Sequence, residues 1–98
     1  MEFTNDFTTI SEDIRKAITE EIRGSLNATP VIICKCSNHP DDDYLYLYIA
    51  LAANGYIAGL ANTSRNGYVG LYENHYVCTF KGALQILADK IYDCNSKL

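Results

Sequence analysis

Cysteine and histidine residues fall in two short stretches whose spacing suggests a metal site. Cys34, Cys36 and His39 lie close together, and His75 lies three positions before Cys78. Four such side chains can complete the tetrahedral shell of a zinc ion. The spacing is not that of zinc fingers or ribbons, and the residue two positions before Cys34 is an isoleucine on the same strand face. We therefore expect thiols that pack in a core as small apolar groups, and no metal site.

Cys78 and His75 are also the residue types of a nucleophile and its general base. No third residue stands out that would orient the histidine. The sequence also lacks G-x-S-x-G, H-E-x-x-H and a phosphate-binding glycine loop. We predict that the protein is not an enzyme and uses no cofactor.

Three consecutive carboxylates, Asp41, Asp42 and Asp43, precede a stretch rich in β-forming residues. Carboxylates bind hard cations such as Ca²⁺, but this run does not match the calcium-loop pattern D-x-[DN]-x-[DN]-G. Beside tyrosines, the carboxylates would suit arginine and lysine side chains of a partner protein. A solvated turn that carries like charges is the alternative. We predict contact with a partner that has a basic surface.

Tyrosines alternate with aliphatic residues in the stretch that follows. Tyr44, Tyr46 and Tyr48 would share one face of a strand, and Tyr68 and Tyr72 flank a glycine in a later strand. Tyrosine suits the wet face of a one-sided sheet. It is also enriched at protein interfaces, where it offers a large contact area at low entropy cost. We predict that these tyrosines and the three aspartates form a partner-binding surface; a homodimer through the same face is an alternative.

Hydrophobic periodicity predicts the elements that position these residues. Isoleucines recur every four residues from Ile10 to Ile22, which is the stripe of an amphipathic helix. Thr9 and Ser11 are rival N-caps of this helix, and Gly24 is its expected end. The predicted helices cover residues 11–23 and 80–93, the predicted strands cover residues 30–37, 44–53, 56–62 and 68–72, and residues 73–79 are ambiguous between a fifth strand and an approach to the last helix.

The Asn54-Gly55 pair is the strongest hairpin signal in the chain and predicts a two-residue type I′ turn. That turn would pair Ile49 with Leu60 and Tyr48 with Ala61, which places aliphatic and phenolic side chains on opposite faces. The aliphatic face, which we expect to pack beneath both helices, consists of Leu45, Leu47, Ile49, Leu51 and Leu60.

These elements predict one domain, residues 1–98, of the α+β class. The expected fold is a two-layer sandwich of order α-β-β-β-β-α. It consists of an antiparallel meander of four or five strands with the N-terminal and the C-terminal helix on one face. On the opposite face the tyrosines would stand beside Gly59, Ala61 and Gly70 and leave hollows. A small-molecule site for a nucleotide-like ligand in these hollows is the alternative function.

The charge balance excludes several classes of partner. The 98 residues carry a net charge of −4 with a pI near 4.9, whereas binding to nucleic acid or to an anionic membrane requires a basic face. The N-terminal segment lacks the features of a signal peptide, and no apolar run approaches the length of a membrane span. We expect a cytoplasmic protein with reduced cysteines, and no membrane or direct nucleic-acid contact.

A small, acidic α+β chain with an aromatic surface and no catalytic motif is similar in type to small inhibitor proteins. Anti-CRISPR and other anti-defence proteins of phages have this profile, and so do immunity proteins that block a toxin. The likeness is one of type and involves no particular residues. The sequence therefore predicts a protein-interaction module: a stand-alone inhibitor that occupies a basic surface on a larger nucleic-acid-handling or defence complex.

Overall fold

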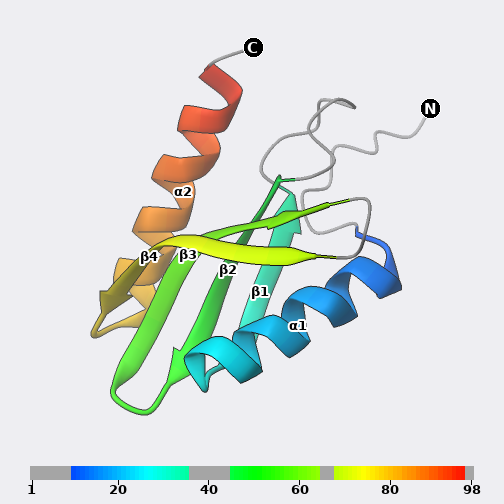
Figure 1. The fold of residues 1–98 in the computed structure, drawn as a ribbon. Helices are drawn as coiled ribbons and strands as arrows, with labels where there is room; N and C mark the ends of the chain where they lie inside the picture. Colours follow the sequence, from blue (N-terminus) through cyan, green and yellow to red (C-terminus); the bar gives the residue numbers. More distant parts are fainter. Residues whose placement is uncertain (1–9, 36–44, 65–67, 97–98) are drawn as a thin grey trace, which may run out of the picture.

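A computed structural model describes residues 10–35, 45–64 and 68–96 of the chain. The elements follow the predicted order α-β-β-β-β-α, and the four strands form one antiparallel sheet in the order β1-β2-β3-β4 (Figure 1). This arrangement confirms the α+β class and the meander. The helices are α1 (Glu12–Leu26) and α2 (Phe80–Ser96), and the strands are β1 (Thr29–Lys35), β2 (Leu45–Ala52), β3 (Gly55–Thr63) and β4 (Val69–Val77).

Helix α1 begins and ends at residues that satisfy its terminal backbone groups. The Ile14 N–H donates to Ser11 Oγ at 3.3 Å, so Ser11 is the N-cap. At the other end Asn27 adopts the left-handed conformation, with φ 52°, and its N–H donates to the Arg23 carbonyl oxygen at 3.2 Å. The helix therefore continues past Gly24, where we expected it to stop.

The β2–β3 hairpin turns one residue earlier than the Asn-Gly signal predicted. The pair Ala53-Asn54 forms the loop, and β3 already begins at Gly55. The register is consequently shifted by two residues, and Tyr48 lies opposite Gly59. A two-residue shift keeps every side chain on its face of the sheet. Phenolic and aliphatic side chains of β2 therefore occupy opposite faces, as predicted.

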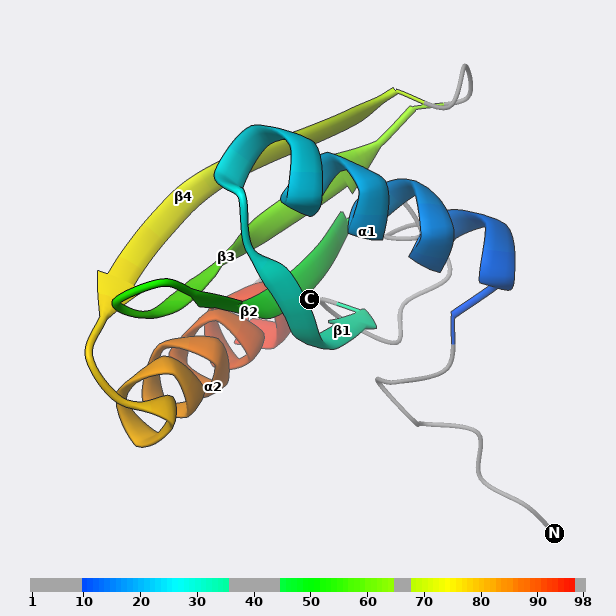
Figure 2. The same cartoon turned by 90° about the horizontal axis from the view of Figure 1, so that it is seen from below.

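The two helices lie on opposite faces of the sheet, which corrects the expectation that both would cover one face. Figure 2 shows α1 on one side of the strands and α2 on the other. The residues from Tyr46 to Ala50 on β2 are all buried, so both faces of this central strand are apolar and covered. A sheet that is apolar on both faces needs a helix on each. The molecule is a three-layer arrangement of helix, sheet and helix.

A separate hydrophobic core fills each space between a helix and the sheet. The α1-side core contains Ile18, Ile22, Ala28, Ile33, Tyr46, Tyr48, Ala50, Ile57 and Ala61. The α2-side core contains Cys34, Leu47, Ile49, Ala58, Leu60, Ala83 and Leu87. Successive side chains of β2 alternate between the two cores, so the sheet is the shared wall of both.

Strand β4 extends through the stretch that the sequence left ambiguous. Residues 73–77 continue the strand, so the described part of the chain has no separate fifth strand. The chain then enters α2 at a second capped start, where the Gly82 N–H donates to Thr79 Oγ1 at 3.0 Å. Within the described ranges, neither helix combines the length and the apolar character that a membrane crossing requires.

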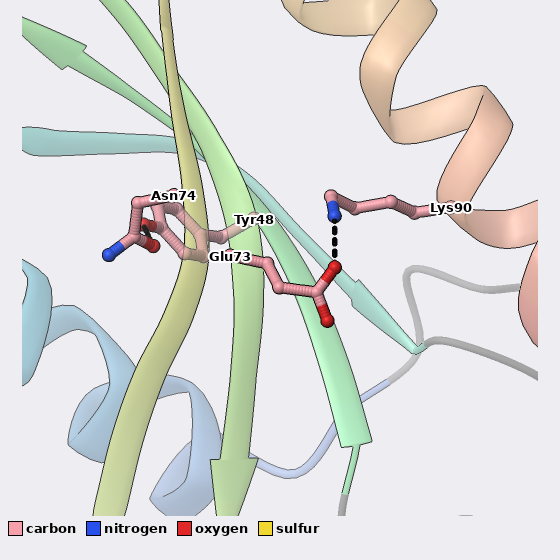
Figure 3. A network of polar contacts seen from close by, with 4 residues as sticks. All are labelled: Tyr48, Glu73, Asn74 and Lys90. Carbon is pink, nitrogen blue, oxygen red and sulfur yellow. Dashed lines mark hydrogen bonds and ion pairs between the residues drawn. The ribbon is translucent and has the colours of Figure 1, made fainter.

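A β-bulge interrupts the pairing of β4 with β3. Between Tyr72 and His75, two residues of β4 face the single residue Gly59 of β3. The first of the two, Glu73, has a left-handed φ of 52°, a conformation that residues other than glycine rarely adopt. The bulge directs the side chains of Glu73 and Asn74 to different sides of the sheet (Figure 3).

Candidate interaction surface

The predicted tyrosine surface is buried where the structure describes it. Tyr46 is 2% exposed and Tyr48 is 0% exposed, so neither side chain can reach a partner protein. Tyr44 and the acidic run Asp41–Asp43 lie outside the described residues. The prediction of a partner-binding face is therefore wrong for Tyr46 and Tyr48.

Helix α1 covers this face because its isoleucine stripe needs an apolar surface on which to pack. Ile18 and Ile22 are fully buried in the same core as the two tyrosine rings. The rings fill the space beside small residues of β3: a Cβ added at Gly59 would lie 3.0 Å from the Tyr48 ring, and Ala61 is fully buried. Gly59 and Ala61 therefore line no hollow. This corrects the expectation that the tyrosines would leave hollows beside these two residues.

A hydrogen bond satisfies the buried hydroxyl of Tyr48. The hydroxyl donates to Asn74 Oδ1 in the β4 bulge (Figure 3). Burial, and secondarily the nearby Tyr76 phenol, raise the pKa of Tyr48 above its usual range. The side chain is thus a neutral hydrogen-bond donor inside the protein, with a structural role.

The other bulge residue, Glu73, contacts the opposite layer. Its carboxylate accepts from Lys90 Nζ of α2 at 3.1 Å (Figure 3). The lysine is the more buried partner, with 12% of its side chain exposed against 58% for the glutamate. The two bulge residues together connect β4 to Tyr48 of the α1-side core and to helix α2.

Three other tyrosines are exposed along β4. Tyr68 immediately precedes the strand and is 78% exposed, Tyr72 is 38% exposed, and Tyr76 is 70% exposed. Tyr68 and Tyr72 belong to the predicted surface. Tyr76 was missed because it lies in the ambiguous stretch; the sequence signal for it is the β-forming run His75–Val77, which extends the strand.

The exposed tyrosines of β4 stand on both faces of the sheet. Tyr72 lies opposite Leu60, an α2-side core residue, whereas Tyr76 lies opposite Ile57, an α1-side core residue. Partial burial and the adjacent Glu73 carboxylate raise the pKa of Tyr72, so at neutral pH its hydroxyl is protonated and can donate. An extended chain placed beside β4 would meet tyrosines on both faces.

The two edges of the sheet, β1 and β4, differ in how they discourage pairing with another strand. Strand β1 carries Pro30, a register irregularity directly after it, and Lys35, all of which oppose strand addition. The nine residues of β4 include no proline, lysine or arginine, and their one acid, Glu73, is held in an ion pair. Apart from its bulge, β4 is the less protected edge.

The cysteine and histidine residues do not gather into a site within the described ranges. Cys34 is buried in the α2-side core on β1, whereas His75 and Cys78 are exposed on and just after β4, at the other edge. Burial raises the pKa of Cys34 to about 11, which makes it a poor nucleophile at neutral pH. No group of three or more metal-binding side chains occurs there. Cys36 and His39 lie outside those ranges.

A pocket of about 340 Å³ lies at the hairpin end of the sheet. Three segments line it: Leu26–Asn27 at the end of α1, Ala52–Tyr56 in the β2–β3 hairpin, and Tyr76–Cys78 at the end of β4. None of these residues carries a charged side chain. Sequence reasoning could not find this pocket, because it depends on which face α1 covers and on where α1 ends.

In the part of the chain that the structure describes, the edge of β4 and the pocket are candidate binding sites. Comparison of the chain with protein-family models, with curated proteins and with solved structures finds no match. A functional proposal for this chain therefore depends on its own geometry and charge.

Proposed function

We propose that the protein is a protein-interaction module that binds its partner along the edge strand β4. The β4 surface consists of the open backbone edge of β4 and the exposed side chains of Tyr68, Tyr72 and Tyr76. The observation that carries the proposal is the coincidence of three exposed tyrosines with the less protected edge of the sheet. This surface replaces the buried face of β2 as the place where tyrosines meet a partner.

Strand addition is the binding mode that this surface supports best. An extended segment of the partner would accept and donate main-chain hydrogen bonds at the free edge of β4. Tyr72 and Tyr76 would flank that segment from opposite faces of the sheet. Tyrosine rings provide large contact areas at low entropy cost, and their hydroxyls donate hydrogen bonds at the rim. The bulge at Glu73 would divide the contact into two short segments.

The partner that we propose presents a basic surface, because the chain carries a net charge of −4. Five of the twelve acids, Glu2, Asp6 and Asp41–Asp43, lie outside the described residues. Basic surfaces are typical of complexes that handle nucleic acid. A stand-alone inhibitor of such a complex, of the anti-defence or immunity type, remains the most specific form of the proposal. The proposal assigns the protein a binding role without catalysis.

The test compares charged substitutions on and off the β4 surface. Wild-type protein and the variants Tyr72→Lys, Tyr76→Lys and Tyr92→Lys are immobilised, and proteins retained from a lysate of the source cells are quantified by mass spectrometry. Tyr92 is 72% exposed on α2 and serves as the matched control. We expect wild type and Tyr92→Lys to retain the same partner protein in equal amounts, and Tyr72→Lys and Tyr76→Lys to lose it. The melting temperatures of the four immobilised proteins should agree within about 4 °C, which shows that the substitutions do not unfold the chain.

Equal retention by all four proteins would contradict the proposal, and so would a loss confined to Tyr92→Lys. Light scattering of the purified chain tests self-association as well. A dimer that Tyr72→Lys dissociates would support the β4 surface and identify a second copy of the chain as its partner.

A further inference from the structure

The pocket at the hairpin end of the sheet shares Tyr76 with the β4 surface but includes neither Tyr68 nor Tyr72. It is bordered by the last residues of α1, by the β2–β3 loop and by the end of β4. We propose that this pocket binds an uncharged, planar, largely apolar small molecule. This inference does not depend on the proposed function, because ligand binding is measured on the chain alone, where no partner engages the shared residue Tyr76.

The size of the pocket fits a compound of one or two rings. Its volume of about 340 Å³ lies at the lower end of the range of about 300–1,000 Å³ that is usual for small-molecule sites. A cavity of about 150 Å³ is enough for benzene. The pocket thus has room for two fused rings.

The lining favours an apolar ring system. Leu26 and Ala52, which pack against the α1-side core, provide aliphatic surface, and Tyr76, on the same face of the sheet, provides an aromatic ring. The Tyr56 ring instead faces the α2-side core, where it makes a tilted contact with the Phe80 ring at a centroid distance of 5.5 Å, and Val77 packs against the same core. The exposed ring of Tyr76 is available for an additional stacking or edge contact with a ligand.

The absence of charged lining residues decides the charge of the ligand. A carboxylate or an ammonium group would lose water on entering the pocket and would meet no opposite charge there. The uncharged polar residues Asn27, Asn54 and Cys78 can pair with a single polar atom of the ligand. A neutral molecule with one hydrogen-bonding group therefore fits both the apolar and the polar part of the lining.

The first test uses three probes that share one ring system: neutral indole, anionic indole-3-acetate and cationic tryptamine. Each is titrated into the full chain while backbone amide resonances are recorded. We expect saturable shifts with indole at residues 26–27, 52–56 and 76–78, and binding of both charged probes that is weaker by about tenfold or more. Alkylation of the exposed Cys78 thiol, followed on its own peptide by mass spectrometry, should slow in the presence of indole.

Three variants make the test specific. Ala53→Trp, at an exposed loop position that lines the pocket, should abolish the indole shifts by filling the space. Tyr92→Ala and Tyr72→Lys lie outside the lining and should leave indole binding unchanged. Tyr72→Lys also separates this site from the β4 surface, because it removes the proposed partner contact alone.

Three results would overturn the inference. One is the absence of saturation with indole up to about 10 mM, which is beyond the affinity of a usable site. Another is tighter binding of either charged probe than of indole. The third is unchanged indole binding by Ala53→Trp, checked to be folded by its amide spectrum, since that would place the probe elsewhere on the protein.

Discussion

Gly59 is the position at which this sheet has no room for a side chain. The residue lies opposite Tyr48 on β2 and opposite the bulge on β4. A Cβ built on it would lie 2.5 Å from Asn74 Oδ1 and 3.0 Å from the Tyr48 ring. Both distances are shorter than ordinary van der Waals contact. The missing side chain allows the Tyr48 ring to cross the strand and reach Asn74.

We predict that Gly59→Ala lowers the free energy of unfolding by about 1–3 kcal/mol, because either the ring or Asn74 must move. The matched control is Gly24→Ala on α1, where nothing lies within 4 Å of the added Cβ. Alanine is favoured over glycine inside a helix by about 0.5–1 kcal/mol, so the control should gain stability. Urea denaturation of both variants measures the difference, and equal stabilities would contradict this account of Gly59.

At the residue scale, the sequence predicted which side chains share a face but not which face is exposed. The alternation along β2 correctly separated Tyr46 and Tyr48 from Leu47 and Ile49. Tyrosine is amphipathic, so its presence is compatible with either a wet face or a packed one. The small residues Gly59 and Ala61 of β3 were the available signal for burial, because they leave the space that the tyrosine rings fill.

At the scale of elements, the bulge in β4 is the feature that organises the edge strand. Glu73 adopts a left-handed conformation there, which is unfavourable for a residue with a Cβ. Its carboxylate is held by Lys90 of α2 at 3.1 Å. The glutamate is more than half exposed, so this ion pair contributes little. Backbone strain and ion-pair attraction therefore act in opposite directions at one residue.

Two substitutions of Glu73 separate these effects. Both Glu73→Gly and Glu73→Ala remove the carboxylate, but only glycine adopts the left-handed conformation without a penalty. We predict that the glycine variant is more stable than the alanine variant by about 1 kcal/mol. Thermal and urea unfolding measure the difference. If the alanine variant were equally stable, residue 73 would have relaxed out of the left-handed region, and the bulge would not be a fixed part of the strand.

Element boundaries were predictable wherever periodicity was long, and less so at turns. The isoleucine stripe located α1, but the helix passes Gly24 and ends at Asn27. In the hairpin, Gly55 is required by its own φ of 154° and also by β4, because a Cβ on it would lie 2.5 Å from the Val77 carbonyl oxygen. This contact joins residues far apart in sequence, so a rule based on the residues of the turn alone cannot predict it. The same limit hid Tyr76, whose strand depends on a bulge.

At the scale of the whole molecule, one sheet separates two cores that share its strands. Ile18 belongs to the α1-side core and Cys34 to the α2-side core, and both are buried. Strand β2 contributes Tyr48 to the first and Ile49 to the second, although they are neighbours in the chain. Neither helix layer can lose its packing while β2 and β3 keep theirs intact. The three layers should therefore unfold as one cooperative unit.

This cooperativity gives a prediction that spans the sheet. Removing one methyl group by Ile18→Val on α1 should lower the free energy of unfolding by about 0.5–1.5 kcal/mol. Two readouts in urea test this: alkylation of the Cys34 thiol, which lies on the far side of the sheet, and the ring resonances of Tyr48, which belongs to the same core as residue 18. Because unfolding is global, both readouts should give the same loss in the free energy of unfolding. Val31→Ala, at a half-exposed position of β1, is the control and should change both readouts by less than about 0.5 kcal/mol. The contradicting result would be an Ile18→Val variant whose unfolding transition moves when followed at Tyr48 and stays in place when followed at Cys34. The two cores would then unfold independently, and a single sheet with two alternating faces would not explain the stability of this fold.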